Sequence, residues 1–301
     1  MGPTLARMAK RASVLAGVNR RVFGVSRFSS RDLPRQLQSW GIESVEADLL
    51  DPPSLASLPD APNVVYMAGV KFGTTGQESL TWAMNAYLPA LVCQRYSESR
   101  IAAFSTGNVY GLSPVGGGGS RETDPLNPVG EYAMSCVGRE RMFEHFSRTF
   151  HLPVTLLRLN YATELRYGVL VDIAQGVHAG RAISLGMGYL NAIWQGDACA
   201  MSLQALAHTA SPPFVINIAG PELLSVRTVA EAFGARFKKA VMFEGQEADD
   251  ALLSDGRRSH ELFGLPQVTA DRLIGWIADW ITRGGETWGK STHFEDRAGR
   301  F

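Results

Sequence analysis

Short apolar runs alternate with longer segments of helical periodicity through the first half of this 301-residue chain. The apolar runs are rich in β-branched residues and lie at 21–25, 43–46, 63–67, 101–105 and 154–159. The helix-like segments that separate or precede them are 4–16, 31–40, 77–97 and 132–149. Alternating strands and helices predict βαβ units, and right-handed crossovers make the resulting parallel sheet doubly wound. Because the runs show little polar alternation, we expect helices on both faces of this α/β sheet.

The second half of the chain is less regular and predicts a smaller α/β unit. Its expected strands are 189–194 and 214–218. Its expected helices are 170–179, 197–208, 226–238, 257–263 and 270–283. The tail after Gly284 is polar, and we expect it to lie along the surface.

Composition argues against several partners and suggests a compartment. Acidic and basic residues balance at 29 each, so no global field favours nucleic acid or a membrane surface. No apolar run approaches the ~20 residues of a membrane span. Cys93, Cys136 and Cys199 lie far apart without metal-ligand spacing, which predicts no metal site and suits a reducing, cytoplasmic location. The basic segment 1–31 has the composition of a transit peptide, but its periodicity favours a surface helix followed by a strand.

The start of the chain lacks the strand that should precede its first helix. Met1-Gly2-Pro3 opens directly into helical periodicity, and Pro3 suits a first helical turn. A dinucleotide-binding turn, G-x-G-x-x-G, follows a strand and opens such a helix, so Gly2 is all that remains of its glycines. That strand is central in its sheet, and its loss removes buried contacts worth on the order of 10 kcal/mol. We therefore expect the natural gene to begin upstream, with Met1 an internal methionine.

Three segments together resemble one enzyme family. Residues 104–111 (FSTGNVYG) end a strand like the family's SS-x-x-VYG segment, and residues 131–136 (EYAMSC) begin a helix like its Y-x-x-x-K. Residues 63–69 (NVVYMAG) look like the strand and loop that pass under the cofactor. In this order they resemble the extended short-chain dehydrogenase/reductases, the epimerase/dehydratase group, over nearly the entire chain. The resemblance implies a Rossmann-like dinucleotide-binding domain at 1–165 without its first strand, and a small α/β substrate lobe with the tail at 166–301. Some strands of the lobe are expected to return to the main sheet.

By resemblance, the chemistry is hydride transfer to or from a nicotinamide, with Tyr132 as the acid/base and Thr106 orienting the substrate oxygen. A free tyrosine has a pKa of ~10, and the family lowers it with a lysine one helical turn later. Cys136 stands at that third catalytic position, and a neutral thiol supplies no positive charge. Arg139, two turns from Tyr132 on the same helical face, and Lys71, after the third segment, are the cations that could replace the lysine. Each of these residues also has a purely structural interpretation. Thr106 could cap the end of a strand, Tyr132 could pack on the sheet, and Cys136 could be a small buried apolar residue. Arg139 and Lys71 could be solvated surface charges.

The cofactor implied by the resemblance is NAD or NADP, and the residues favour NADP. Ser26 and Arg27 follow the second strand of the family fold, where an arginine can accept a 2′-phosphate. Asp48-Leu49 resembles the family's adenine-side contact. The alternatives are that Arg27 is one more surface base and that Asp48 is a loop acid ending a strand. The remaining cofactor-binding candidates are Gly2, Ala68, Gly69, Lys71 and Asn85.

Candidates for substrate binding are Asn108, Asn160 and Tyr161, although Ala162-Thr163 replaces the family's Gly-Pro after the tyrosine. The sequence thus predicts an NAD(P)-dependent oxidoreductase, epimerase or dehydratase that acts on a small hydroxylated or sugar-like substrate.

The alternative function is that of a catalytically degenerate relative that binds a nucleotide or a protein. Cys136 and the reduced glycine loop favour this second reading. In many relatives the helices at 77–97 and 132–149 form a dimer face, so the resemblance also implies a homodimer.

Overall fold

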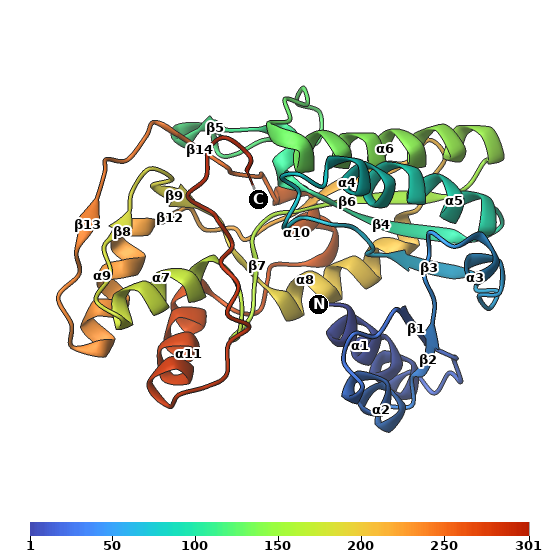
Figure 1. The fold of residues 1–301 in the computed structure, drawn as a ribbon, viewed down its shortest axis with the longest axis horizontal. Coiled ribbons are helices and arrows are strands. Elements are labelled where there is room, and N and C mark those ends of the chain that lie inside the picture. Colours follow the sequence, from blue (N-terminus) through green and yellow to red (C-terminus); the bar gives the residue numbers. More distant parts are fainter. Residues whose placement is uncertain (301) are drawn as a thin grey trace.

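The computed structural model describes residues 1–300 and has a four-stranded parallel sheet at its centre (Figure 1). The strands are β3 (Asn63–Tyr66), β4 (Arg100–Thr106), β6 (Val154–Leu159) and β11 (Phe214–Ile218). Their spatial order is β11-β6-β4-β3, and every neighbouring pair is parallel. Because helices cover both faces, β4 is buried from its second residue to its last. The predicted doubly wound α/β sheet is confirmed.

Strands β1 (Phe23–Ser26) and β2 (Glu43–Glu46) form a parallel pair of their own. Among the described strands, β1 pairs only with β2, and β3 pairs only with β4. The first strand of a Rossmann sheet lies between the two strands that correspond to β1 and β3. No strand within residues 1–300 takes that position. Figure 1 shows β1 and β2 grouped with α1 (Gly2–Leu15) and α2 (Asp32–Ser39) below the β3 edge of the main sheet.

One face of the main sheet is covered by α6 (Gly130–Phe150) and by a longer helical stretch. That stretch runs through α4 (Glu78–Trp82), a π-helical turn at Ala83–Tyr87 and α5 (Leu88–Arg95). The sequence predicts one helix here, and the π turn places Asn85 on its buried side. The apolar residues beneath these helices include Leu88, Val92, Cys93, Phe143 and Leu156.

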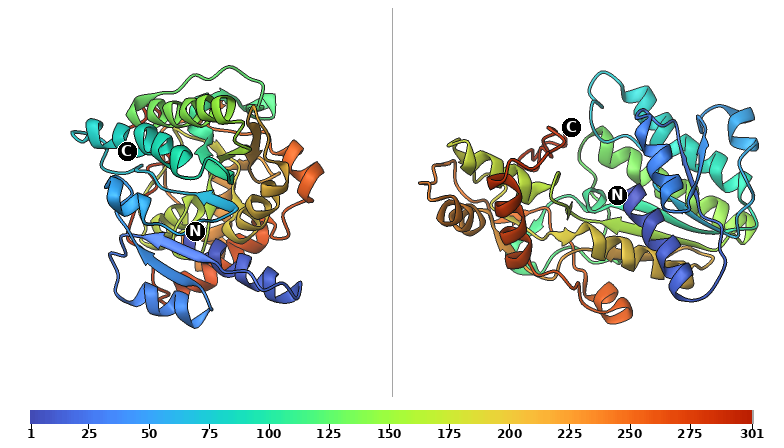
Figure 2. Two further views of the ribbon diagram at one scale, coloured as in Figure 1. Left: turned by 90° about the vertical axis from the view of Figure 1, so that its right-hand side faces the viewer. Right: turned by 90° about the horizontal axis from the view of Figure 1, so that it is seen from below.

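The other face is covered by α8 (Gln195–Gln204) and α10 (Arg257–Phe263), and α1 packs against α8 (Figure 2). The side-chain amide of Gln195 donates to the Thr4 hydroxyl across this contact at 3.1 Å. The small α3 (Pro52–Ala56) leads from β2 towards β3, with the Asp51 carboxylate capping its first turn. Within residues 1–300, none of the helices combines the length and the apolarity needed to cross a membrane.

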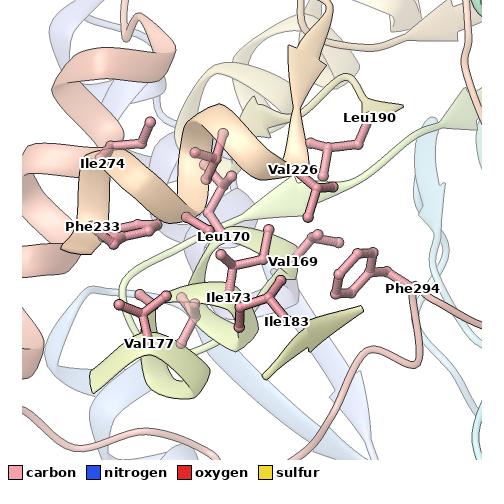
Figure 3. Close-up of a cluster of buried hydrophobic side chains, with 14 of the residues drawn as sticks. Val169, Leu170, Ile173, Val177, Ile183, Leu190, Val226, Phe233, Ile274 and Phe294 are labelled. Atoms are coloured by element: carbon pink, nitrogen blue, oxygen red, sulfur yellow. The ribbon is translucent and has the colours of Figure 1, made fainter. Parts of the chain in front are cut away.

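The C-terminal lobe has its own apolar core among α7 (Val169–His178), α9 (Val226–Phe237) and α11 (Ala270–Thr282). Figure 3 shows side chains from these helices meeting around Leu170, Ile173 and Phe233. The expected strand at 189–194 is divided into two short strands, 189–190 and 193–194. Asn191 lies between the two, and its buried side-chain amide donates to the Gly220 and Ser254 carbonyls. Short ladders pair β5 (Ser113–Pro114) with β14 (Asp250–Ala251), β7 (Ala162–Thr163) with β10 (Ile193–Trp194), β8 (Ile183–Ser184) with β13 (Phe243–Glu244), and β9 (Tyr189–Leu190) with β12 (Leu224–Ser225).

The tail lies along the surface for most of its length, as the sequence predicts, but it is anchored by two buried side chains, Thr292 and Phe294. Thr292 donates two hydrogen bonds to the Asp172 carboxylate, at 2.7 Å from its nitrogen and 2.6 Å from its hydroxyl. The Phe294 side chain is buried in the core of the lobe, and the backbone of Gly299 lies against that of Gly130 at the start of α6. In Figure 1 the tail therefore runs between the lobe and the sheet domain. The average polarity of the tail does not predict these buried contacts, because they are made by single side chains such as Thr292 and Phe294.

Candidate active site

Thr106 is the last residue of β4 and lies at the carboxyl edge of the sheet, where open α/β sheets bind ligands. Its hydroxyl oxygen accepts hydrogen bonds from the Asn108 backbone nitrogen at 3.2 Å and from the Asn108 side-chain amide at 2.9 Å. Asn108 sits in the short 3₁₀ turn Gly107–Tyr110 that follows the strand. With both of these donors directed at its oxygen, the Thr106 hydroxyl proton is left to donate elsewhere.

Tyr132 comes to this edge from the first turn of α6. Its side chain hydrogen-bonds with both Thr106 and Cys136. Burial raises the pKa of the Tyr132 phenol above its usual value, and the nearby Cys136 thiol raises it further, while Arg139 and the Thr106 hydroxyl oppose the rise. The structure therefore brings together the tyrosine, the threonine and the cysteine that the sequence pairs, with the tyrosine held as a neutral phenol.

Cys136 and Arg139 lie below Tyr132 on the inner side of α6. Cys136 is fully buried, and burial raises the pKa of its thiol. The Arg139 guanidinium is also buried, and it donates to the Phe104 carbonyl at 2.9 Å and to the Asn85 side-chain oxygen at 2.7 Å. Arg139 thus adds positive potential from beneath the site and at the same time ties α6 to β4 and to the π turn.

The loop after β3 is fastened by Asn85. Its side-chain oxygen accepts from the Val70 nitrogen at 2.8 Å, and its amide donates to the Val70 carbonyl at 2.8 Å and to the Ser135 hydroxyl at 2.9 Å. Gly69 passes so close to Arg139 that a β-carbon there would lie 2.2 Å from a guanidinium nitrogen. Asn85 and Gly69, two of the predicted cofactor-binding residues, thus fix the position of the loop that contains Ala68 and Lys71.

Lys71 projects from this loop towards Tyr132. Its ammonium nitrogen lies 5.8 Å from the centroid of the Tyr132 ring and 5.3 Å from that of Phe72. Burial lowers the pKa of Lys71 to about 8, and the nearby Cys136 and Asp172 side chains act in the opposite direction. The two cations that the sequence offers therefore lie on different sides of Tyr132, with Arg139 engaged in the interior and Lys71 facing a cleft.

This cleft is narrow and partly open to solvent, and it lies between the sheet edge, the lobe and the tail. The sheet domain contributes Lys71 and Asn108 to its lining, together with Tyr161. The tail contributes Thr292, His293, Phe294, Asp296, Arg297 and Gly299. Two of the three predicted substrate-binding residues thus meet at one cavity. The third, Asn160, is buried beside it, and its amide donates to the Asn191 side-chain oxygen at 2.7 Å.

The residues expected to hold the cofactor's nucleoside end lie on the separate strand pair. Ser26 and Arg27 are exposed at the carboxyl end of β1, and Asp48 is exposed just after β2. Leu49 packs its side chain against the core under the main sheet. An exposed base and hydroxyl at a strand end fit a ribose and its 2′ substituent.

The start of α1, where a dinucleotide's pyrophosphate would bind, offers fewer of the expected contacts than the nucleoside end does. Helix α1 begins at Gly2, where a β-carbon would meet no atom within 4 Å, and Pro3 has no N–H to donate. Burial lowers the pKa of the Met1 amino group, and the Cys199 thiol and the Glu164 carboxylate are among the groups that act on it. The described residues therefore fit the nucleoside and nicotinamide ends of a dinucleotide better than its phosphates.

A buried ion pair that the sequence analysis missed lies directly behind the site. Glu140 on α6 and Arg158 on β6 form two hydrogen bonds of 2.9 and 2.7 Å. The Ser105 hydroxyl donates to Glu140 at 2.5 Å, and Arg158 also donates to the Tyr110 hydroxyl at 2.7 Å. Tyr110 in turn donates to the Asn217 side chain at 2.8 Å, so the network joins three strand ends. The signal in the sequence is the single arginine within the apolar run 154–159, since a buried charge requires a partner.

Comparisons with known proteins agree with this geometry. Residues 2–219 match the NAD dependent epimerase/dehydratase family. Among curated proteins, no similar sequence is found.

Several solved structures share the fold at low sequence identity. UDP-glucose 4-epimerase from Thermotoga maritima, solved with UDP-glucose, is 16% identical at a TM-score of 0.74, over 93% of this chain and 96% of its own. UDP-glucuronic acid 4-epimerase from Bacillus cereus, solved with UDP-glucuronic acid and NAD, has the same identity, TM-score and coverage. RMD from Pseudomonas aeruginosa, complexed with NADPH, is 18% identical at a TM-score of 0.71, over 88% of this chain and 100% of its own. The family match spans well over half of the chain, which therefore belongs to the NAD dependent epimerase/dehydratase family.

Proposed function

We propose that this protein is an NAD(P)-dependent oxidoreductase, epimerase or dehydratase that acts on a small hydroxylated or sugar-like substrate. The observation that carries the proposal is the hydrogen-bonded pair of Thr106 and Tyr132 at the carboxyl edge of the sheet. Lys71, Asn108 and Tyr161 line a partly open cleft at this edge and offer a substrate an amine, an amide and a phenol as hydrogen-bonding groups. In this role Thr106 and Tyr132 bind the reacting oxygen and stabilise the charge that develops on it.

We propose a nicotinamide cofactor, with NADP favoured over NAD. Solved structures of the same fold contain NAD or NADPH, and Arg27 provides the positive charge that a 2′-phosphate needs. When bound, the nicotinamide accepts or supplies the hydride. The Ala68–Lys71 loop, fixed by Asn85, would define one wall of its site, and Ser26, Arg27, Asp48 and Leu49 would hold the adenosine end.

The substitutions Tyr132→Phe and Thr106→Val test this function. Each is expected to lower kcat/KM by about 10²–10⁴, because each removes a hydroxyl from the reacting oxygen. The measurement is the change in nicotinamide absorbance with a panel of hydroxylated and sugar substrates at millimolar cofactor. Tyr96→Phe is the matched control, since the Tyr96 hydroxyl bonds the Pro59 carbonyl away from the site. Equal activity in Tyr132→Phe and the control would exclude the proposed role.

Arg27→Asp tests the cofactor preference. The substitution is expected to shift the ratio of NADPH to NADH affinity at least tenfold towards NADH, about 1.4 kcal/mol, because it replaces a phosphate partner by a repelling charge. The measurement is a calorimetric titration with each cofactor. Arg31→Asp makes the same charge change at an exposed position four residues further along the basic segment 1–31 and controls for the general field. A shift of the same size in both variants would count against a specific contact by Arg27.

The second candidate function is a catalytically degenerate relative that binds a nucleotide or a protein. The observation that favours it is Cys136, which buries a neutral thiol where the family places a lysine. Such a protein would bind nucleotides while turning over no member of the substrate panel.

The remaining expectations concern organisation. We propose that residues 1–165 act as the dinucleotide-binding domain and residues 166–301 as the substrate lobe, which the separate core of the lobe supports. We also propose a cytoplasmic homodimer whose interface is formed by α4, α5 and α6. Trp82 and Tyr87 on the first helical stretch and Met134 on α6 are exposed, as an apolar contact surface requires.

A further inference from the structure

Tyr132 is poorly placed to exchange a proton near neutrality. Its hydroxyl lies between the Thr106 hydroxyl and the Cys136 thiol, in surroundings that favour the neutral phenol. Arg139 is the cation that opposes this effect, but its guanidinium is committed to the Phe104 carbonyl and the Asn85 side chain. The lysine that the family places one helical turn after the tyrosine is replaced here by the buried Cys136.

Lys71 is the strongly basic group that lines the cleft from the sheet domain. Its amine lies 5.8 Å from the Tyr132 ring centroid, so a substrate oxygen hydrogen-bonded to Tyr132 comes within its reach. The loop that carries it is fixed on both sides of the Val70 peptide by Asn85, which limits its motion. Position, rigidity and access to the cleft are the properties that a proton-transferring group requires.

The groups around Lys71 come from four elements. Cys136 and Tyr132 face it from α6, and Asp172 acts on it from α7. Tyr161 after β6 and the tail residues His293, Asp296 and Arg297 line the same cleft. The Asp172 carboxylate is engaged by Thr292, Arg297 pairs with Asp250, and Asp296 accepts from the Arg300 side chain and backbone. Arg297 and Asp296 are thus paired with opposite charges, Asp172 opposes the effect of burial, and burial dominates the ionisation of Lys71, whose pKa it lowers to about 8.

We propose that Lys71 is the acid/base residue of this site and that Tyr132 remains a neutral hydrogen-bond donor to the substrate oxygen. This inference rests on the proposed function and specifies its proton path. In the oxidative direction, the substrate O–H bond breaks and its proton goes to the neutral Lys71 amine. The carbinol C–H bond would give up its hydride as the C=O bond forms, and a bound nicotinamide would accept that hydride. In the reductive direction, the Lys71 ammonium returns the proton to the carbonyl oxygen.

The pH dependence of activity distinguishes Lys71 from Tyr132 as the acid/base residue. In the wild-type protein, kcat/KM for oxidation is expected to rise with pH and level off above about 8, because the neutral amine is the active form. Tyr132→Phe should lower the rate but keep this break. Lys71→Met should lower the rate about 10²–10⁴-fold and remove the break. A break that disappears in Tyr132→Phe and persists in Lys71→Met would overturn the proposal. Lys290→Met, at an exposed position outside the cleft, is the matched control.

A second readout does not depend on turnover. Lysine side chains can be dimethylated with ¹³C and followed by NMR, and the chain offers only Lys10, Lys71, Lys238, Lys239 and Lys290 besides the N-terminal amine. One signal, absent from Lys71→Arg, is expected to titrate near pH 8, about two units below an ordinary lysine. Titration of that signal at the ordinary value would overturn the proposal. If the wild-type protein turns over no substrate, the proposed function fails, and the NMR titration alone decides whether Lys71 is poised to exchange a proton.

Discussion

Glu140→Ala is expected to lower the free energy of unfolding by about 3–5 kcal/mol, since removing one partner of a buried ion pair leaves the other charge uncompensated. Glu140 and Arg158 are 3% and 5% exposed, so water cannot replace the lost carboxylate. The Ser105 hydroxyl would lose its acceptor at the same time. Chemical denaturation followed by circular dichroism measures the change.

Two controls separate the buried pair from helix effects. Glu144→Ala removes a carboxylate from the next turn of α6, where it bonds the exposed Arg141 and Arg148, and should cost less than about 1 kcal/mol. The double variant Glu140→Leu/Arg158→Met removes both charges and should be more stable than Glu140→Ala. A double variant at least as unstable as the single one would show that packing, and not the stranded charge, sets the cost.

The 301-residue chain is expected to bind NADPH with a Kd weaker than about 1 mM, an affinity worth only about 4 kcal/mol. Pyrophosphate is bound by successive backbone N–H groups at a helix start, and here Gly2 is followed by Pro3, which has none. The Glu164 carboxylate and the Arg166 guanidinium act on the Met1 amino group in opposite directions and are paired with each other at 3.0 Å, so they add no net charge that would attract a phosphate to this helix end. Isothermal calorimetry or quenching of tryptophan fluorescence measures the affinity.

A designed extension sharpens this test. Joining a short apolar strand and a G-x-G-x-x-G turn to the N-terminus should tighten NADPH binding at least tenfold, because it adds the missing N–H donors and a partner for the β1 and β3 ladders. The same extension with alanines in place of the glycines controls for the strand alone. Micromolar binding by the unextended chain would mean that another segment supplies the phosphate donors.

The architecture followed from the sequence because it depends on local periodicity. The apolar runs at 63–67, 101–105, 154–159 and 214–218 became the four strands of the main sheet, since a strand covered on both faces must be continuously apolar. The sequence also singled out Thr106 and Tyr132 as candidates, because one stands at a recognisable strand end and the other at a helix start, and the structure places the two side chains in contact.

Contacts between residues far apart in the chain could not be predicted from the sequence. The pairing of Glu140 with Arg158 joins a helix to a strand, and neither periodicity nor spacing specifies it. The polarity of the tail indicated its surface course but not its anchoring, which depends on the buried Phe294 and on the bonds from Thr292 to Asp172. Lys71 could be named as a candidate cation, but its burial and its place in the cleft arise from the packing of four elements.

The separation of β1 and β2 from the central sheet also bears on how the molecule opens. No ladder connects this pair to β3, so α1, α2, β1 and β2 are joined to the remainder by side-chain packing, including that of α1 on α8. Such a unit can open alone, and its backbone amides then exchange with solvent at a much lower free-energy cost than those of β4 and β6. We therefore expect the molecule to contain two cooperative units of unequal stability, of which the weaker one carries Arg27, the residue proposed to contact the 2′-phosphate of NADP.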